Sequence, residues 1–104
     1  MVNEADIVEA GRRISAAAPA ARVILFGSHA REEADERSDL DLLVIEPEVG
    51  DPAGESVRLR RTLRGLNIPA DIVVIDAALA RRRSAVPGTM IERALREGRV
   101  LVDA

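Results

Sequence analysis

The chain has 104 residues, a net charge of −3 at pH 7 and no cysteine. This length favours one domain over residues 1–104, and the lack of cysteine excludes disulfides, thiolate catalysis and cysteine-based zinc sites. The acidic balance and the single aromatic residue, Phe26, argue against nucleic acid as the main partner. The chain begins without a signal-peptide pattern, and no apolar run approaches the ~20 residues of a membrane span. We therefore expect a cytoplasmic protein with no membrane partner.

The first elements in chain order are a helix, a strand and a turn. Asn3 is a suitable N-cap for a helix over about residues 3–18, which Pro19 ends. Four apolar residues share one face of this helix: Ile7, Ala10, Ile14 and Ala17. Residues 22–26 are short, apolar and β-branched, which is typical of a buried strand. Gly27-Ser28 then predicts a turn, followed by a short helix over residues 29–34.

A second strand and helix follow. Residues 39–45 predict the strand, and Asp51-Pro52 predicts a helix start with Asp as N-cap and Pro at the first helical position. We expect this helix to reach about Leu66 with leucines inward. The arginines expected largely outward are Arg58, Arg61 and Arg64.

The last part of the chain repeats the alternation. Residues 70–75 predict a third strand, and Asp76 can cap a short helix through about residue 83. Thr89 and Glu92 form a capping-box pattern for a helix ending at Gly98. Residues 100–102 predict an edge strand, whose apolar character leaves an oligomer open. The expected class is α/β (α+β): a mixed sheet of three to four strands flanked by helices.

The Gly27-Ser28 turn is a candidate phosphate site. Glycine permits close approach of a ligand to the backbone, and the start of a following helix would offer unpaired N–H groups. The Ser28 hydroxyl can donate to a phosphate oxygen, and Arg31 is a nearby cation. The alternative is an ordinary strand-to-helix turn with Ser28 as a cap.

Asp39, Asp41 and Asp71 are candidate metal ligands. Residues two apart in a strand point to the same face, so Asp39 and Asp41 project together. Asp71 begins the next strand in the same way, and oxygen ligands of this kind select Mg²⁺ or Mn²⁺. The alternative is that Asp39 caps the strand start while Asp41 faces solvent.

The Gly-Ser turn and the Asp-x-Asp pair together, at their observed spacing, are a more specific motif than either one alone. Gly27-Ser28, ten residues, then Asp39-Leu40-Asp41 resembles the signature of minimal nucleotidyltransferases of the polymerase-beta superfamily. The resemblance spans residues 24–44 and extends to Asp71. It implies the nucleotidyltransferase fold, a triphosphate site at Gly27 and Ser28 with Arg31, and metal ligation by the three aspartates. It also makes Asp71 a candidate general base.

The resemblance further implies transfer of a nucleoside monophosphate, from ATP as the expected substrate, with Mg²⁺ or Mn²⁺ as cofactor. Members of this size often pair with a HEPN-domain toxin, so we expect a protein acceptor and a role as an antitoxin that AMPylates a HEPN ribonuclease. One alternative is a non-catalytic antitoxin that neutralises its partner by contact. A third reading, an RNA-binding module, rests only on arginine clusters such as residues 81–83. Arginines of residues 58–64 are a candidate surface for an acidic partner helix.

Overall fold

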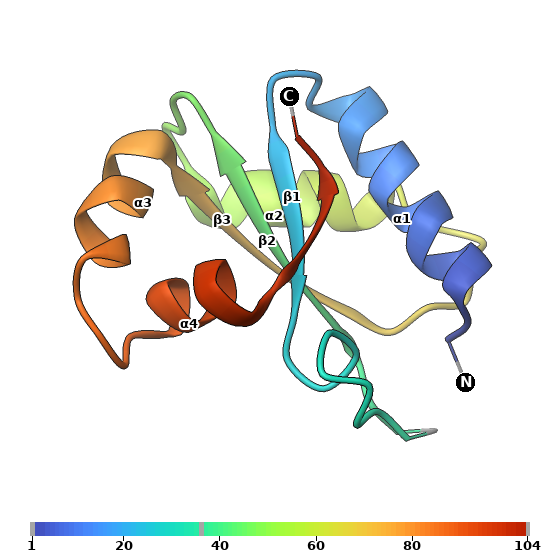
Figure 1. Cartoon of the computed structure of the whole chain (residues 1–104). Helices are drawn as coiled ribbons and strands as arrows, with labels where there is room; N and C mark the ends of the chain where they lie inside the picture. Colours follow the sequence, from blue (N-terminus) through green and yellow to red (C-terminus); the bar gives the residue numbers. More distant parts are fainter. Residues whose placement is uncertain (1, 36, 104) are drawn as a thin grey trace.

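The computed structural model describes residues 2–35 and 37–103. It forms a four-stranded sheet of order β3-β2-β1-β4 with helices on both faces (Figure 1). The strands are β1 (Arg22–Phe26), β2 (Leu40–Glu46), β3 (Ala70–Asp76) and β4 (Arg99–Val102). The helices are α1 (Glu4–Ala17), α2 (Pro52–Arg61), α3 (Ala77–Ser84) and α4 (Met90–Glu97). Strand β1 is antiparallel to β2 and β4, whereas β2 and β3 are parallel. The predicted mixed sheet is therefore confirmed.

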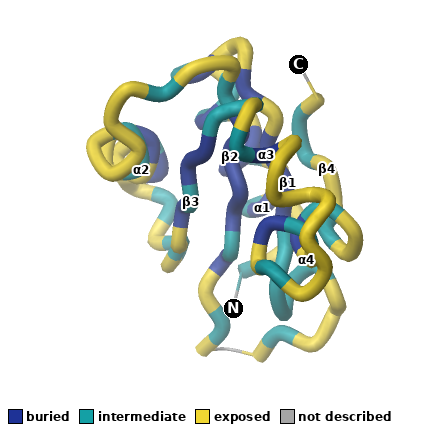
Figure 2. Tube along the Cα trace, turned by 90° about the vertical axis from the view of Figure 1, so that its left-hand side faces the viewer, coloured by how far each residue is buried: buried dark blue, intermediate teal, exposed yellow. Residues whose placement is uncertain are grey.

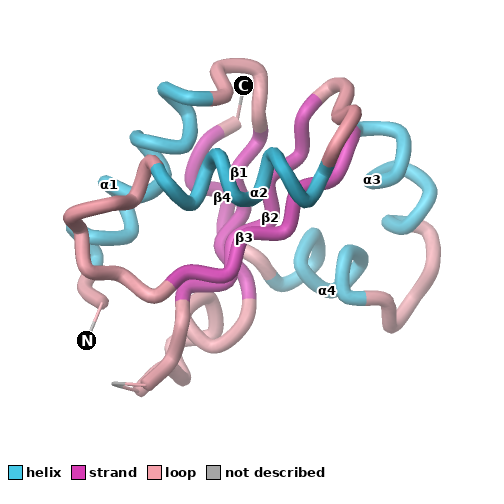
Figure 3. The backbone as a smooth tube through the Cα atoms, turned by 180° about the vertical axis from the view of Figure 1, so that it is seen from behind, coloured by secondary structure: helices cyan, strands magenta, loops and turns pink. Residues whose placement is uncertain are grey.

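The two faces of the sheet bury different apolar residues. Val23 and Leu25 of β1 pack with α1 and α2, and the neighbouring Ile24 packs on the opposite face with α3 and α4. Figure 2 shows that many of the buried residues lie along β1, β2 and β3, and Figure 3 shows α2 crossing one face of the sheet. This alternation follows from the two-residue period of a strand. Among the described residues, no helix is long and apolar enough to cross a membrane.

Four of the predicted helix starts are confirmed, because each N-cap side chain accepts a backbone hydrogen bond. The caps are Asn3, Asp51, Asp76 and Thr89. The Thr89 box differs in one detail: the Glu92 carboxylate accepts from the N–H of Gly88 at 3.0 Å, one residue before the cap. Thr89 still receives the Glu92 N–H at 3.2 Å, so this end of α4 is satisfied from both sides.

Two sequence predictions are corrected by the structure. Residues 29–34 do not form a helix: Glu32 has a φ of +58°, and the Glu33 N–H bonds to the Ser28 carbonyl, five residues back. A left-handed residue cannot continue an α-helix, so the segment closes as a turn.

The second correction concerns the end of α2, which lies at Arg61 and not near Leu66. Residues 62–65 continue as turns. The guanidinium of Arg13 donates to the carbonyls of Thr62 and Arg64 at 3.2 and 3.0 Å, which satisfies backbone acceptors beyond the helix end. This contact comes from α1, so no local pattern could reveal it.

Gly98 joins α4 to β4 at a point where the backbone leaves no room for a side chain. A Cβ here would overlap the Ala94 carbonyl oxygen and lie 2.9 Å from the Leu25 carbonyl oxygen, although φ is an ordinary −74°. We expect Gly98→Ala to lower the free energy of unfolding by about 2–3 kcal/mol in urea denaturation, because backbone atoms must shift. Gly50→Ala is the control, since its Cβ would meet nothing within 4 Å. Equal stability of the two variants would contradict the packing argument.

Glu46, at the end of β2, makes stability depend on pH. Burial, followed by the neighbouring Glu55 carboxylate, raises the pKa of Glu46 from 4.5 to about 7. One Glu46 oxygen is buried without a hydrogen-bond partner among the described residues. Between pH 4.5 and about 7 the folded chain therefore holds a proton that the unfolded chain has released. The contribution of protonated Glu46 to the free energy of unfolding is therefore complete below pH 4.5 and is lost as the pH rises through about 7.

Removing this carboxyl group should remove that loss. We expect the free energy of unfolding of Glu46→Gln, measured relative to that of the wild type, to increase by on the order of 1 kcal/mol from about pH 5 to pH 8. This figure allows for solvent screening. The measurement is urea denaturation at both pH values. Glu48→Gln, at an exposed position two residues away, is the control and should show no such gain. A parallel pH dependence of wild type and Glu46→Gln would show that Glu46 does not titrate as described.

Candidate functional site

The Gly-Ser turn and two aspartates lie at one end of three adjacent strands. Phe26 at the end of β1 is opposite Asp41 near the start of β2, and Asp41 is beside Asp71 near the start of β3. This follows from topology, because an antiparallel neighbour ends where its partner begins and a parallel neighbour begins there. Gly27 therefore follows directly onto the strand end that carries the carboxylates.

Asp41 and Asp71 point to the same face of the sheet. Asp41 alternates with Leu40 and Leu42, which are buried on the α1 and α2 side. Further along the α3 and α4 side lie Leu43 in β2 and Val73 in β3. The two-residue period predicted from the sequence thus places both carboxylates on the α3 and α4 side.

The carboxylates of this end differ in burial and influence one another. Asp41 is half-buried, whereas Asp39 and Asp71 are exposed. Burial raises the pKa of Asp41, and the negative charges of Asp71 and Asp39 raise it further; His29 and Arg31 act in the opposite direction. The site therefore carries uncompensated negative charge, which a bound cation would neutralise.

Gly27 lies directly against Asp41. Its φ is +74°, and a Cβ at this position would overlap the Asp41 Oδ2 and lie 3.1 Å from Cγ. Only glycine fits both the left-handed backbone and this contact. The turn thus brings main-chain atoms next to the carboxylate without a side chain between them.

The turn is held in place by polar contacts. The His29 Nε2 donates to the Ser38 carbonyl at 3.2 Å, which ties the turn to the segment before β2. Arg31 pairs with Glu33 at 3.0 Å, and both side chains are largely exposed. His29 therefore has a structural contact, and Arg31 is held at the exposed rim of the turn.

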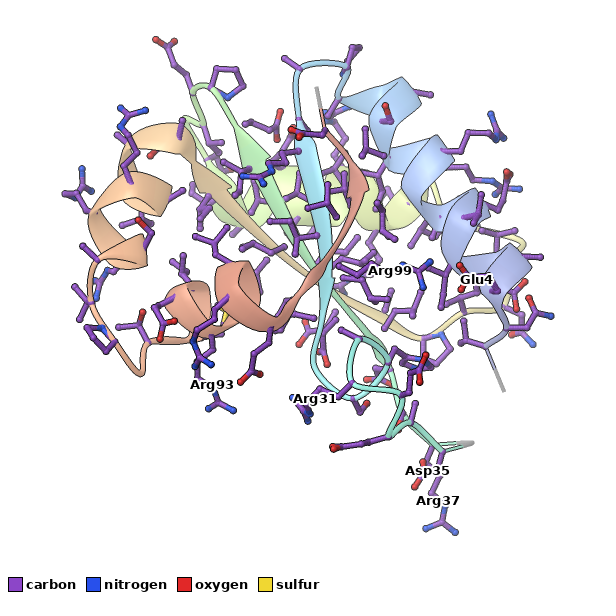
Figure 4. All side chains as sticks on the ribbon, viewed as in Figure 1. Glu4, Arg31, Asp35, Arg37, Arg93 and Arg99 are labelled. Atoms are coloured by element: carbon purple, nitrogen blue, oxygen red, sulfur yellow. The ribbon has the colours of Figure 1, made fainter. Side chains whose placement is uncertain are left out.

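A pocket of about 370 Å³ separates the turn from α4. Arg31 and Gly27 line it from the turn, and Arg93 and Met90 line it from α4. Figure 4 shows Arg31 and Arg93 at the same lower margin of the molecule, from the loop after β1 and from α4. Sequence reasoning missed Arg93. An arginine on a short helix carries no local signal that its helix packs beside the turn.

The residues of this end fit a divalent cation by their chemistry. Asp39, Asp41 and Asp71 offer only carboxylate oxygens, the ligands that Mg²⁺ and Mn²⁺ prefer. In the part of the chain from residue 2 to 35 and 37 to 103, no three acidic or histidine side chains are already close enough together to hold a metal ion. Burial, and after it the charges of Asp71 and Asp39, raise the pKa of Asp41.

Comparisons with known proteins connect this arrangement to one family. The sequence profile described as "Nucleotidyltransferase domain" matches residues 7–86. A putative nucleotidyltransferase from Sulfolobus solfataricus has a similar structure, with a TM-score of 0.60, 19% identity, and coverage of 92% of this chain and 76% of that chain. No curated protein matches the sequence.

Two further similar structures are toxin–antitoxin structures. The one described as containing AMP-PNP has a TM-score of 0.55 and 19% identity, over 99% of this chain and 75% of that chain. The other is a mutant of the toxin–antitoxin MntA-HpeT, with a TM-score of 0.56 and 18% identity, over 99% and 75% of the two chains. At these identities the likeness establishes a shared fold.

Proposed function

Because the chain belongs to the nucleotidyltransferase domain family, we propose that it transfers AMP from ATP to a hydroxyl group of a protein acceptor. The observation that carries this proposal is the meeting of Gly27, Asp41 and Asp71 at one end of three adjacent strands. Asp39 is the residue before β2, the strand that contains Asp41, and its negative charge acts on Asp41. A glycine turn beside several carboxylates suits a nucleoside triphosphate with its cation.

In the reaction, an oxygen of the acceptor forms a bond to the α-phosphorus of ATP. The bond from that phosphorus to the bridging oxygen of the β-phosphate breaks, and pyrophosphate leaves. Gly27 and Ser28 bind the triphosphate, and Arg31 and Arg93 neutralise its outer charges. Asp71 accepts the proton of the attacking hydroxyl group. When bound by Asp39, Asp41 and Asp71, Mg²⁺ or Mn²⁺ supplies charge neutralisation at the phosphates.

We further propose that the acceptor is a HEPN-domain toxin and that this chain is its antitoxin in the cytoplasm. Two similar structures are toxin–antitoxin structures, and one of them contains AMP-PNP, an analogue of ATP. AMPylation would then silence the toxin.

Transfer of AMP is tested with ATP labelled at either end. The chain is incubated with Mg²⁺, the protein encoded by the neighbouring reading frame, and ATP labelled at the α- or the γ-phosphate. We expect the α-label on the acceptor protein and the γ-label in pyrophosphate. Neutralisation of the toxin without any transferred label would favour an antitoxin that acts by contact and would refute the transferase proposal.

The pocket beside α4 gives a prediction for nucleotide binding. We expect Arg93→Ala to raise the KM for ATP about tenfold, because one charge-assisted contact to phosphate is lost. Arg82→Ala is the control, since Arg82 is exposed on α3 and does not line the pocket. Equal KM values for ATP in both variants would show that Arg93 does not contact the nucleotide.

A further inference from the structure

A second hollow adjoins Asp39 on the α2 side of the sheet. A groove of about 700 Å³ lies between the end of α2, the turns that follow it and the start of β3. Its wall includes Arg60, Arg61 and Arg64, together with the apolar Val57 and Ile68. We call this hollow the basic groove.

The arginines of the basic groove carry unneutralised charge. All three are exposed, and no carboxylate among the described residues lies within 4.0 Å of any of them. Arg58, two residues before Arg60 on α2, pairs with Glu55 at 2.6 Å. The positive charges at a helix end favour its dipole, but three arginines facing one hollow also attract an anionic ligand.

The basic groove reaches the strand end at which the three aspartates lie. Asp39 belongs to its wall, as does Ala70, the residue before Asp71. The pocket beside α4 lies on the opposite face of the sheet, at the end of β1 and against α4. A nucleophile that displaces pyrophosphate must approach opposite the leaving group. The acceptor is therefore expected from the β3 side, where the basic groove opens.

We propose that the basic groove docks an acidic segment of the acceptor protein and so brings its hydroxyl group to the strand end that carries Asp39, Asp41 and Asp71. This rests on the proposed function and names the chemistry of its acceptor. The three arginines match carboxylates, and Val57, which is 45% exposed, offers apolar contact for a peptide side chain. RNA fits less well, since the sole aromatic residue, Phe26, lines the nucleotide pocket and the net charge is −3.

The test combines Arg60→Gln, Arg61→Gln and Arg64→Gln in one variant. The matched control combines Arg81→Gln, Arg82→Gln and Arg83→Gln, which removes the same charge from three exposed arginines in the last turn of α3. In the transfer assay, we expect the groove variant to raise the KM for the acceptor protein at least about tenfold and to leave the KM for ATP unchanged. The control should leave both values unchanged. Circular dichroism and Tm confirm that both variants fold.

A binding measurement tests the docking groove separately from the proposed transferase activity. A fluorescein-labelled peptide of alternating Glu and Tyr and a single-stranded RNA of equal charge are titrated against the three proteins. We expect the peptide to bind the wild type and the α3 control about tenfold or more tightly than the groove variant. Equal peptide affinity in all three, or tighter binding of the RNA, would overturn the proposal. Peptide binding without any transfer of label would instead refute the proposed function and leave the docking surface standing.

Discussion

Asp41→Asn is expected to lower the rate of AMP transfer by at least about a thousandfold while the chain stays folded, because a ligand of the divalent cation is lost where charge develops. The replaced carboxylate is half-buried and lies near the negative charges of Asp71 and Asp39. Its removal relieves this repulsion, so we expect the variant to have a higher Tm than the wild type without Mg²⁺. Transfer assays and thermal unfolding with and without Mg²⁺ make the measurement.

Magnesium should reverse the order of stability. Addition of Mg²⁺ is expected to raise the Tm of the wild type, since it binds the folded state, and to leave that of Asp41→Asn nearly unchanged. Asp103→Asn is the control: this exposed residue pairs with Arg22 at 3.6 Å, away from the site. A variant that loses stability and activity together would mean that Asp41 supports the fold and not the reaction.

The parts of the fold that local chemistry decides were predictable from the sequence. Caps such as Asp51 and Asp76 mark helix starts because their side chains satisfy backbone N–H groups within three residues. The strands were predictable because short runs of β-branched apolar residues are typical of buried strands. Strand β1 begins and ends where expected, at Arg22 and Phe26. These signals do not depend on the rest of the chain.

Distant contacts decide the parts that were wrong. The turn after Gly27 has a helix-like sequence, but its end is fixed by the link from His29 to Ser38 and by the left-handed Glu32. The turns after α2 are bonded to Arg13, whose guanidinium donates from α1 to the carbonyls of Thr62 and Arg64. Neither contact leaves a periodic trace in the sequence.

The candidate site divides in the same way. The shared face of Asp41 and Asp71 follows from the period of a strand, which the sequence indicates, and from the parallel pairing of β2 and β3, which the structure supplies. Arg93 and the basic groove depend on where α4 and the end of α2 pack, which only the tertiary structure gives. The metal ligation by Asp39, Asp41 and Asp71 stays a prediction.

Gly27→Ala should weaken nucleotide binding strongly while the chain stays folded. An added Cβ would collide with the Asp41 carboxylate, so either the turn or Asp41 must move. We expect the affinity for ATP to fall at least about a hundredfold, because a displacement near 1 Å at a positioned site has an effect of this size. Isothermal titration calorimetry with a non-hydrolysable ATP analogue and Mg²⁺ measures it.

The matched control is Gly65→Ala, which separates the collision from backbone strain. Gly65 has a φ of +89°, close to the +74° of Gly27, but a Cβ there would meet nothing within 4 Å. Both variants should therefore lose about 1 kcal/mol of stability from the left-handed backbone, and only Gly27→Ala should lose affinity for ATP. If both variants bind the nucleotide equally well, the contact between Gly27 and Asp41 does not shape the site, and the turn is an ordinary connection between strands.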